Sequence, residues 1–188
     1  THRVAVRGMA LPDADTFSTP LGPVMLDKDA MQAVAALPHV TVSAPVHAFE
    51  HALEVQLPFL QMVLDDFTLL PLAVGDASSE EVARVLQLVW GGAETLIVVS
   101  SDLSHYLPYE VSKLVDNKTA QDILKLRPGI THDEACGATP VNGLLLAARQ
   151  HHLTPHLLDL RNSGDTAGPR DGVVGYAAFA FCEEDGHE

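Results

Sequence analysis

The chain has 188 residues, of which 47% are hydrophobic. This length supports one sizeable core and leaves little for a second, so we expect a single domain over residues 1–188 and no global disorder. The 25 acidic residues outnumber the 11 basic residues, which gives a net charge of −14. Such a surface repels phosphate backbones and anionic lipid, so neither nucleic acid nor a membrane surface is expected as a partner.

Targeting signals are equally sparse. No apolar run approaches the roughly 20 residues that a membrane-spanning helix needs, and no secretory signal is visible. The two cysteines, Cys136 and Cys182, are too few for a disulfide framework. These features together predict a cytoplasmic protein in a reducing compartment.

The first half of the chain alternates short extended pieces with helices. In chain order, the pattern predicts loops and short strands over 3–26, a helix over 28–37, a strand over 40–44, a helix over 50–64 and a buried strand over 67–74. Asp27 can cap the first of these helices. Pro58 predicts a kink or an early break in the second.

The second half contains the clearest signals. The pattern predicts a helix over 79–90, a strand over 95–100, helices over 109–125 and 140–150, and strands over 157–161 and 173–181. Ser78 with Glu81 matches a capping box. The run over 95–100 is continuously apolar, which is typical of a central strand covered on both faces. The acidic last seven residues are expected to fray.

Strands that alternate with helices predict an α/β fold, with a layered sheet that carries helices on both faces. The last two strands lack an intervening helix, so the sheet is expected to be mixed.

His51 is the first residue that can carry chemistry. It follows Glu50 near the start of the expected helix over 50–64, and Glu54 would share its face. A neutral imidazole there can ligate a metal while a nearby carboxylate orients its other nitrogen. A purely structural histidine is the alternative.

Asp102 and His105 follow the expected strand over 95–100. Functional groups of α/β sheets gather at the carboxyl ends of strands, and an Asp beside a His can fix its tautomer for general acid/base work. The alternative is a local turn cap with an incidental histidine.

Cys136 stands in Ala-Cys-Gly-Ala-Thr-Pro, just before the helix expected over 140–150. Amides at a helix N-terminus favour the reactive thiolate form, so Cys136 is a candidate metal ligand or nucleophile. A small buried residue is the alternative. The chain has no local motif with tight spacing, so these residues alone indicate only an α/β domain with a His/Asp site.

Four segments taken together are more specific. They are EHALEVQLPFLQ around His51, SSDLSHY around Asp102 and His105, ACG at Cys136, and the tail RNSGDTAGPRDGVVGYAAFAF. In this order they resemble the Memo family, also called AmmeMemoRadiSam system protein B, whose fold is similar to class III extradiol dioxygenases. The opening THRVAVRGMALPDADTFSTPLG resembles the segment after that family's first strand, so the chain is expected to lack that strand.

The resemblance implies roles for individual residues. His2 matches the family's first metal-site histidine, and His51 matches the second. Cys136 matches the cysteine that stands where the dioxygenases carry a glutamate ligand. His105 matches the dioxygenase acid/base histidine, with Asp102 beside it.

These roles imply one metal ion held by two imidazoles and a thiolate, with iron or copper favoured and zinc as a further option. The first functional hypothesis is a metal-dependent redox enzyme of dioxygenase-like ancestry. The second is a non-enzymatic metal- or peptide-binding adaptor, and the third is a zinc hydrolase. The resemblance also implies an association with a radical SAM system, and leaves open whether the partner is a small-molecule substrate or a peptide.

Overall fold

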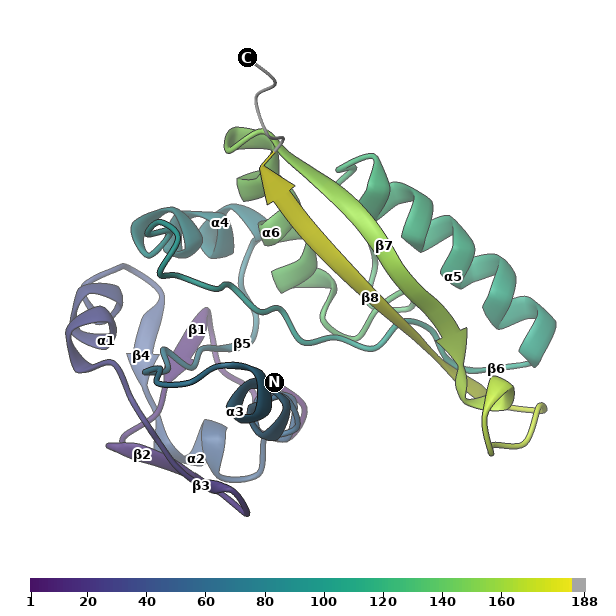
Figure 1. The fold of residues 1–188 in the computed structure, drawn as a ribbon. Helices are drawn as coiled ribbons and strands as arrows, with labels where there is room; N and C mark the ends of the chain where they lie inside the picture. Colours follow the sequence, from purple (N-terminus) through teal and green to yellow (C-terminus); the bar gives the residue numbers. More distant parts are fainter. Residues whose placement is uncertain (184–188) are drawn as a thin grey trace. The chain divides into compact units, whose positions relative to one another are not determined.

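A computed structural model describes residues 1–183 of the chain (Figure 1). Within these residues it is a mixed α/β protein with six α-helices and three small sheets. The chain divides into two compact units, the first ending at Ser100 and the second beginning at Ser101, and each is described by itself. The sequence predicts that residues 182–188 fray. Cys182 and Glu183 instead form the end of the last strand, and 184–188 lie outside the described residues.

The first unit contains most of the short elements. In chain order these are β1 (Met9–Leu11), β2 (Thr16–Thr19), β3 (Gly22–Met25), α1 (Lys28–Ala35), β4 (Val40–Val42), α2 (Ala44–Ala48), α3 (Leu57–Val63), β5 (Ala73–Val74) and α4 (Ser79–Leu88). The predicted caps are confirmed. Asp27 accepts a hydrogen bond from the Ala30 amide, and Ser78 and Glu81 form a reciprocal capping box.

The central sheet of this unit has the order β4-β1-β5, with β1 parallel to β4 and antiparallel to β5. Successive residues of β1 face opposite sides, as in any strand. Met9 and Leu11 pack in one cluster with residues of α1 and α4, whereas Ala10 packs with Val46 of α2. This three-stranded sheet is therefore mixed and has helices packed on both faces. The sequence expected a mixed sheet because of the last two strands, which belong to an antiparallel sheet instead.

Two helix and strand boundaries differ from the prediction. The expected helix over 50–64 begins only at Leu57, because Pro58 occupies its first turn, where a missing amide costs nothing. His51 consequently lies in the turn before α3 and does not share a helix face with Glu54. The expected strand over 67–74 is reduced to β5 and one isolated bridge between Leu26 and Leu69.

The strand predicted over 95–100 is wrong. All six residues are described, and none belongs to a helix or a strand. An apolar run of this length indicates burial but does not specify a hydrogen-bonded neighbour, and Leu96 remains 62% exposed.

The second unit is built around one long hairpin. Its elements are β6 (His105–Leu107), α5 (Tyr109–Leu124), α6 (Ala138–Gln150), β7 (Leu153–Asn162), a short 3₁₀ turn (Ser163–Asp165) and β8 (Val173–Glu183). The antiparallel sheet has the order β6-β8-β7. The four predicted elements over 109–181 are confirmed, and both strands are longer than expected.

The core of this unit lies between the hairpin and its two helices. Ile123 of α5 and Leu145 of α6 share one cluster with Leu160 of β7 and Phe179 of β8. Residues of both helices therefore pack on one face of the hairpin. The extradiol dioxygenase-like layering of the whole chain stays a prediction, as does the single domain.

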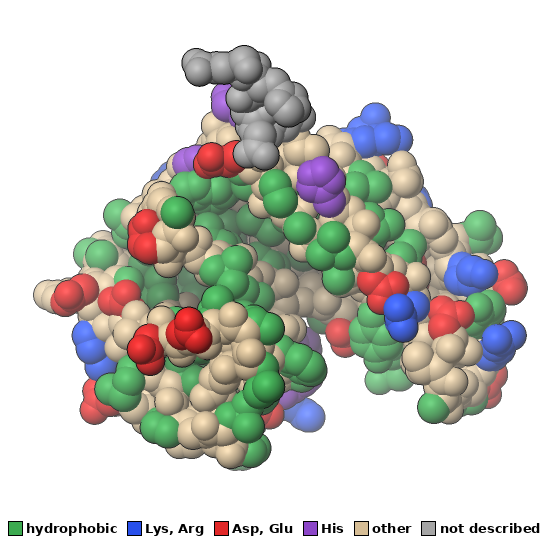
Figure 2. Space-filling view, in the orientation of Figure 1, with side chains coloured by type: hydrophobic (Ala, Val, Ile, Leu, Met, Phe, Trp, Pro, Cys, Tyr) green, Lys and Arg blue, Asp and Glu red, His purple; other side chains and the backbone are tan. Residues whose placement is uncertain are grey.

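The surface is strongly acidic, and Figure 2 shows carboxylate side chains in red on exposed faces of both units. Over residues 1–183, every helix is too short or too polar to cross a membrane.

The capping box of α4 gives a first prediction. Ser78→Ala removes the acceptor for the Glu81 amide, so the free energy of unfolding should fall by about 1 kcal/mol. Urea denaturation followed by circular dichroism measures this loss. Ser79→Ala, the same change one residue later, should have a much smaller effect, and equal losses in the two variants would contradict the capping role.

Candidate functional site

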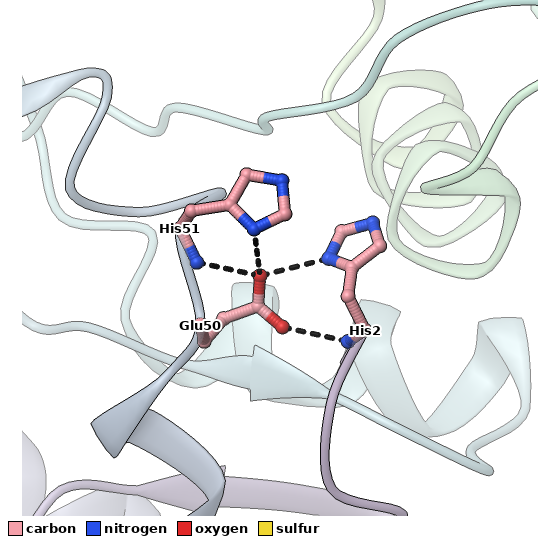
Figure 3. A group of neighbouring side chains, drawn as sticks. All are labelled: His2, Glu50 and His51. Atoms are coloured by element: carbon pink, nitrogen blue, oxygen red, sulfur yellow. Dashed lines mark hydrogen bonds and ion pairs between the residues drawn. The ribbon is translucent and has the colours of Figure 1, made fainter.

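The first candidate group consists of His2, Glu50 and His51 in the first unit (Figure 3). The short helix α2 ends at Ala48 and is held to β1 by His47, whose Nε2 lies 2.8 Å from the Ala10 carbonyl oxygen. Glu50 follows this helix directly. Its side chain is only 4% exposed, whereas those of His2 and His51 are 38% and 58% exposed.

Glu50 fixes both histidines through one carboxylate. Its Oε1 lies 2.8 Å from His2 Nδ1 and accepts the His51 amide at 2.9 Å, and its Oε2 accepts the His2 amide at 2.7 Å. The Ala52 amide donates to the same Oε1 at 3.1 Å. His51 Nδ1 is 3.8 Å from Oε1, which is an ion-pair distance but not a hydrogen bond. The carboxylate thus holds the two loops together.

The geometry leaves both rings with a free ligand atom. The ring centroids are 4.9 Å apart, and Figure 3 shows each Nδ1 turned toward Glu50 and each Nε2 turned away from it. A carboxylate on Nδ1 favours the tautomer that keeps the Nε2 lone pair available for a metal. The chemistry of this donor set therefore fits a transition-metal ion.

The electrostatics of Glu50 agree with this role. Burial raises its pKa, but hydrogen bonds from His2 and from the Ala52 amide outweigh that effect and lower the pKa to about 2. Glu50 is thus an anion throughout the range in which a neutral histidine ligand is available. It is positioned to orient both imidazoles and to balance part of the charge of a bound cation.

The second candidate group consists of Asp102, His105 and Cys136 in the second unit. One ligand atom from each of these residues lies within 4.8 Å of the other two. The Asp102 amide donates to Cys136 Sγ at 3.2 Å, and the Cys136 amide donates to the Asp102 carbonyl at 3.2 Å. These reciprocal contacts fix Cys136 immediately before α6, as the sequence predicts.

Ser101 adds a second connection between the same two segments. Its hydroxyl donates to the Asp102 carbonyl at 2.7 Å and accepts the Gly137 amide at 2.9 Å. The hydroxyl oxygen is 3.7 Å from the Cys136 sulfur. The Cys136 sulfur therefore accepts one amide and lies near the Ser101 hydroxyl and the Asp102 carbonyl oxygen.

Asp102 and His105 form the pair that the sequence predicts. Asp102 Oδ2 is 3.7 Å from His105 Nε2, and both side chains are partly exposed. His105 is the first residue of β6, where it pairs in register with Val174 of β8. The carboxylate therefore lies at ion-pair distance from the imidazole, an arrangement that suits general acid/base work.

Tyr176 of β8 belongs to the same neighbourhood. Burial and then the negative charge of Asp102 raise the pKa of its phenol. The phenol therefore stays protonated at neutral pH.

The structure therefore places His2 with His51, and Asp102 with His105 and Cys136. The prediction that His2, His51 and Cys136 share one ion draws on both units and stays a prediction. Sequence reasoning missed Ser101 and Tyr176, and it left open which nearby carboxylate orients His51, a role that the structure gives to Glu50. The only signal for Glu50 was its place next to His51.

Comparison with known proteins agrees with the motifs. A family model described as Memo-like protein matches residues 1–180. A MEMO1 family protein of Methanosarcina barkeri is 35% identical over 179 residues, which are 88% of this chain and 67% of that protein. One from Archaeoglobus fulgidus is 32% identical over 93% of this chain and 72% of its own length. One from Metallosphaera sedula is 29% identical over 89% and 64%, so the chain spans about two thirds of these relatives.

Removing the Glu50 carboxylate tests the first group. Glu50→Ala should weaken Co²⁺ binding by about 10- to 100-fold, since both imidazoles lose the partner that orients them. Isothermal titration with Co²⁺ measures the change. Glu80→Ala removes an exposed carboxylate from the same unit and should leave the affinity unchanged; equal affinities in all three proteins would contradict the orienting role of Glu50.

The coupling between Asp102 and Tyr176 gives a second test. Asp102→Asn should lower the pKa of Tyr176, because the negative charge that disfavours the phenolate is gone. Titration of the tyrosine ring carbons by NMR follows each phenol separately. Tyr109 is an internal control, because its pKa is raised chiefly by a hydrogen bond to Asp165; a shift of both tyrosines or of neither would rule out a specific coupling.

Proposed function

This chain belongs to the Memo-like family, and from that premise we propose that it is a metal-binding protein with a redox function. The proposed ligands are His2 and His51 from the first unit and Cys136 from the second. The observation that carries the proposal is the buried carboxylate of Glu50, which holds two imidazoles with their Nε2 atoms free.

The ligand types favour iron or copper over zinc. Two imidazoles resemble the histidine part of the non-haem iron pattern, and a thiolate makes the set softer, which suits copper as well. A bound ion of either metal would supply one-electron redox chemistry and an open coordination position. These preferences follow from ligand chemistry, and metal analysis of the purified protein decides between the two ions.

The remaining residues have roles of their own. His105 takes or gives a proton at Nδ1, because its Nε2 faces Asp102 Oδ2 at 3.7 Å. Asp102 stabilises the imidazolium that forms when His105 takes the proton.

Metal content tests the binding part of the proposal. Protein purified anaerobically without added metal should carry roughly one equivalent of iron or copper. His2→Ala, His51→Ala and Cys136→Ser should each lower that content, because each removes a ligand. Cys182→Ser and His156→Ala remove the same residue types from β7 and β8 in the second unit and should retain the metal.

The pattern of losses also tests whether the three ligands share one ion. Loss of the same equivalent in all three variants supports a shared ion. If Cys136→Ser removes a different equivalent from the one that the histidine variants remove, the shared ion is wrong. If none of the three changes the metal content, the proposed ligand set is wrong.

Turnover assays test the redox part. Oxygen uptake with a catechol that depends on His105 supports the enzyme. Bound metal with no turnover on phenols, esters or peroxides would overturn the enzymatic role and leave a metal-binding adaptor. Zinc with ester hydrolysis that depends on His105 would replace the redox function by a hydrolase.

A further inference from the structure

A second buried carboxylate lies behind the group of Asp102, His105 and Cys136. Asp116 is on the inner face of α5 and only 3% exposed. Its Oδ1 accepts the Ser104 amide at 3.0 Å, and its Oδ2 accepts the Ser112 hydroxyl at 2.7 Å. Ser112 Oγ is 3.1 Å from Ser104 Oγ, which closes a small network. Among the residues that the structure describes, no cationic side chain pairs with Asp116.

The network holds the segment that carries the candidate site. Ser104 lies between Asp102 and His105, and its own side chain and amide both point into the network. On the other side, the Leu103 amide donates to the Gly175 carbonyl and the Gly175 amide donates to the Ser104 carbonyl, both at 2.8 Å. The segment 101–105 is thus fixed between α5 and β8.

The packing at Gly175 shows how closely Asp116 approaches the strand. A Cβ atom at this position would lie 2.2 Å from Asp116 Oδ2, which is far inside van der Waals contact. Only glycine therefore lets β8 and the carboxylate occupy their places together. The buried carboxylate, two serines and this glycine therefore all help to hold the one segment.

We propose that Asp116 is a positioning residue that sets Asp102 and His105 in place around Cys136. It touches none of these three side chains and acts through Ser104 and the backbone. A buried carboxylate costs free energy unless hydrogen-bond donors satisfy it. The donor in segment 101–105, the Ser104 amide, is therefore held in one position. The consequence for metal binding or proton transfer rests on the proposed function; the positioning itself does not.

Amide hydrogen exchange tests the positioning without any metal. The Asp102 amide is bonded to Cys136 Sγ and not to Asp116. In Asp116→Ala its exchange should nonetheless become at least about tenfold faster, because the segment loses its anchor. Asp116→Asn keeps an acceptor for Ser104 and a polar partner for Ser112, so it should restore exchange to within about threefold of wild type.

Two controls separate positioning from general stability. Asp122→Ala removes another carboxylate from α5, one that pairs with Lys118, and should leave the Asp102 amide unchanged. Exchange at Leu145 in the core of α6 reports the stability of the whole unit. The proposal is overturned if Asp116→Ala leaves the Asp102 amide unchanged, if Leu145 accelerates equally, or if Asp116→Asn behaves like Asp116→Ala.

A glycine pair tests the same inference from the strand side. Gly175→Ala should displace the Asp116 carboxylate and accelerate exchange at Asp102 as Asp116→Ala does. Gly172→Ala is the matched control, since its Cβ would meet nothing closer than 3.8 Å. Similar exchange in these two glycine variants would also overturn the proposal.

Co²⁺ binding provides the functional readout. The thiolate-to-Co²⁺ absorption band reports ligation by Cys136, and the apparent affinity should be about tenfold weaker in Asp116→Ala and close to wild type in Asp116→Asn. If the wild-type protein shows no such band, the proposed function fails while the exchange data still decide the positioning. If the band and affinity are unchanged in Asp116→Ala although exchange accelerates, Asp116 has no role at this site.

Discussion

A buried carboxylate needs hydrogen-bond donors, and this constraint shapes both candidate groups. The side chains of Glu50 and Asp116 are almost fully buried, and each accepts from a loop amide and from a side chain. The side-chain partner of Glu50 is His2, and that of Asp116 is Ser112 on the same helix. An unsatisfied buried anion would cost several kcal/mol. The loops that supply these donors are therefore held in one conformation. Within residues 1–183, every buried side-chain nitrogen and oxygen has a hydrogen-bond partner.

The two carboxylates act at different distances from the chemistry. Glu50 lies beside both imidazoles, and its 2.8 Å contact with His2 Nδ1 sets the tautomer of that ring as well as its place. Asp116 acts one layer further back, through Ser104 and the backbone. Removing Glu50 should therefore change ligand basicity and orientation together, whereas removing Asp116 should change orientation alone. For the same reason an amide in place of the carboxylate should suffice at position 116, where the donors are an amide and a hydroxyl.

The sequence predicted the elements whose signals are local. The capping residues Asp27 and Ser78 located helices because a cap and its partner lie three residues apart. The strand predicted over 95–100 was wrong, because hydrophobicity indicates burial whereas strand pairing depends on a neighbour that is distant in sequence. Asp116 gave no signal at all, since an acidic residue in a polar helix is typical of a solvated face. Glu50 and His2 are bonded across 48 residues, which no local pattern can reveal.

The family resemblance supplied what local patterns could not, because it joined residues spread over the chain into one expected set. The geometry then divides that set by physical role. Within the first unit, two exposed imidazoles share one buried anion, which is an arrangement suited to ligating a cation. Within the second, a thiol, an imidazole and a carboxylate lie within 4.8 Å of one another, beside a phenol whose pKa is raised by burial and by Asp102. That combination can ligate as well as move a proton. The proposed enzyme would therefore differ from a simple metal carrier at the Asp102–His105 pair, because a carrier needs ligands but has no use for a carboxylate at ion-pair distance from a histidine.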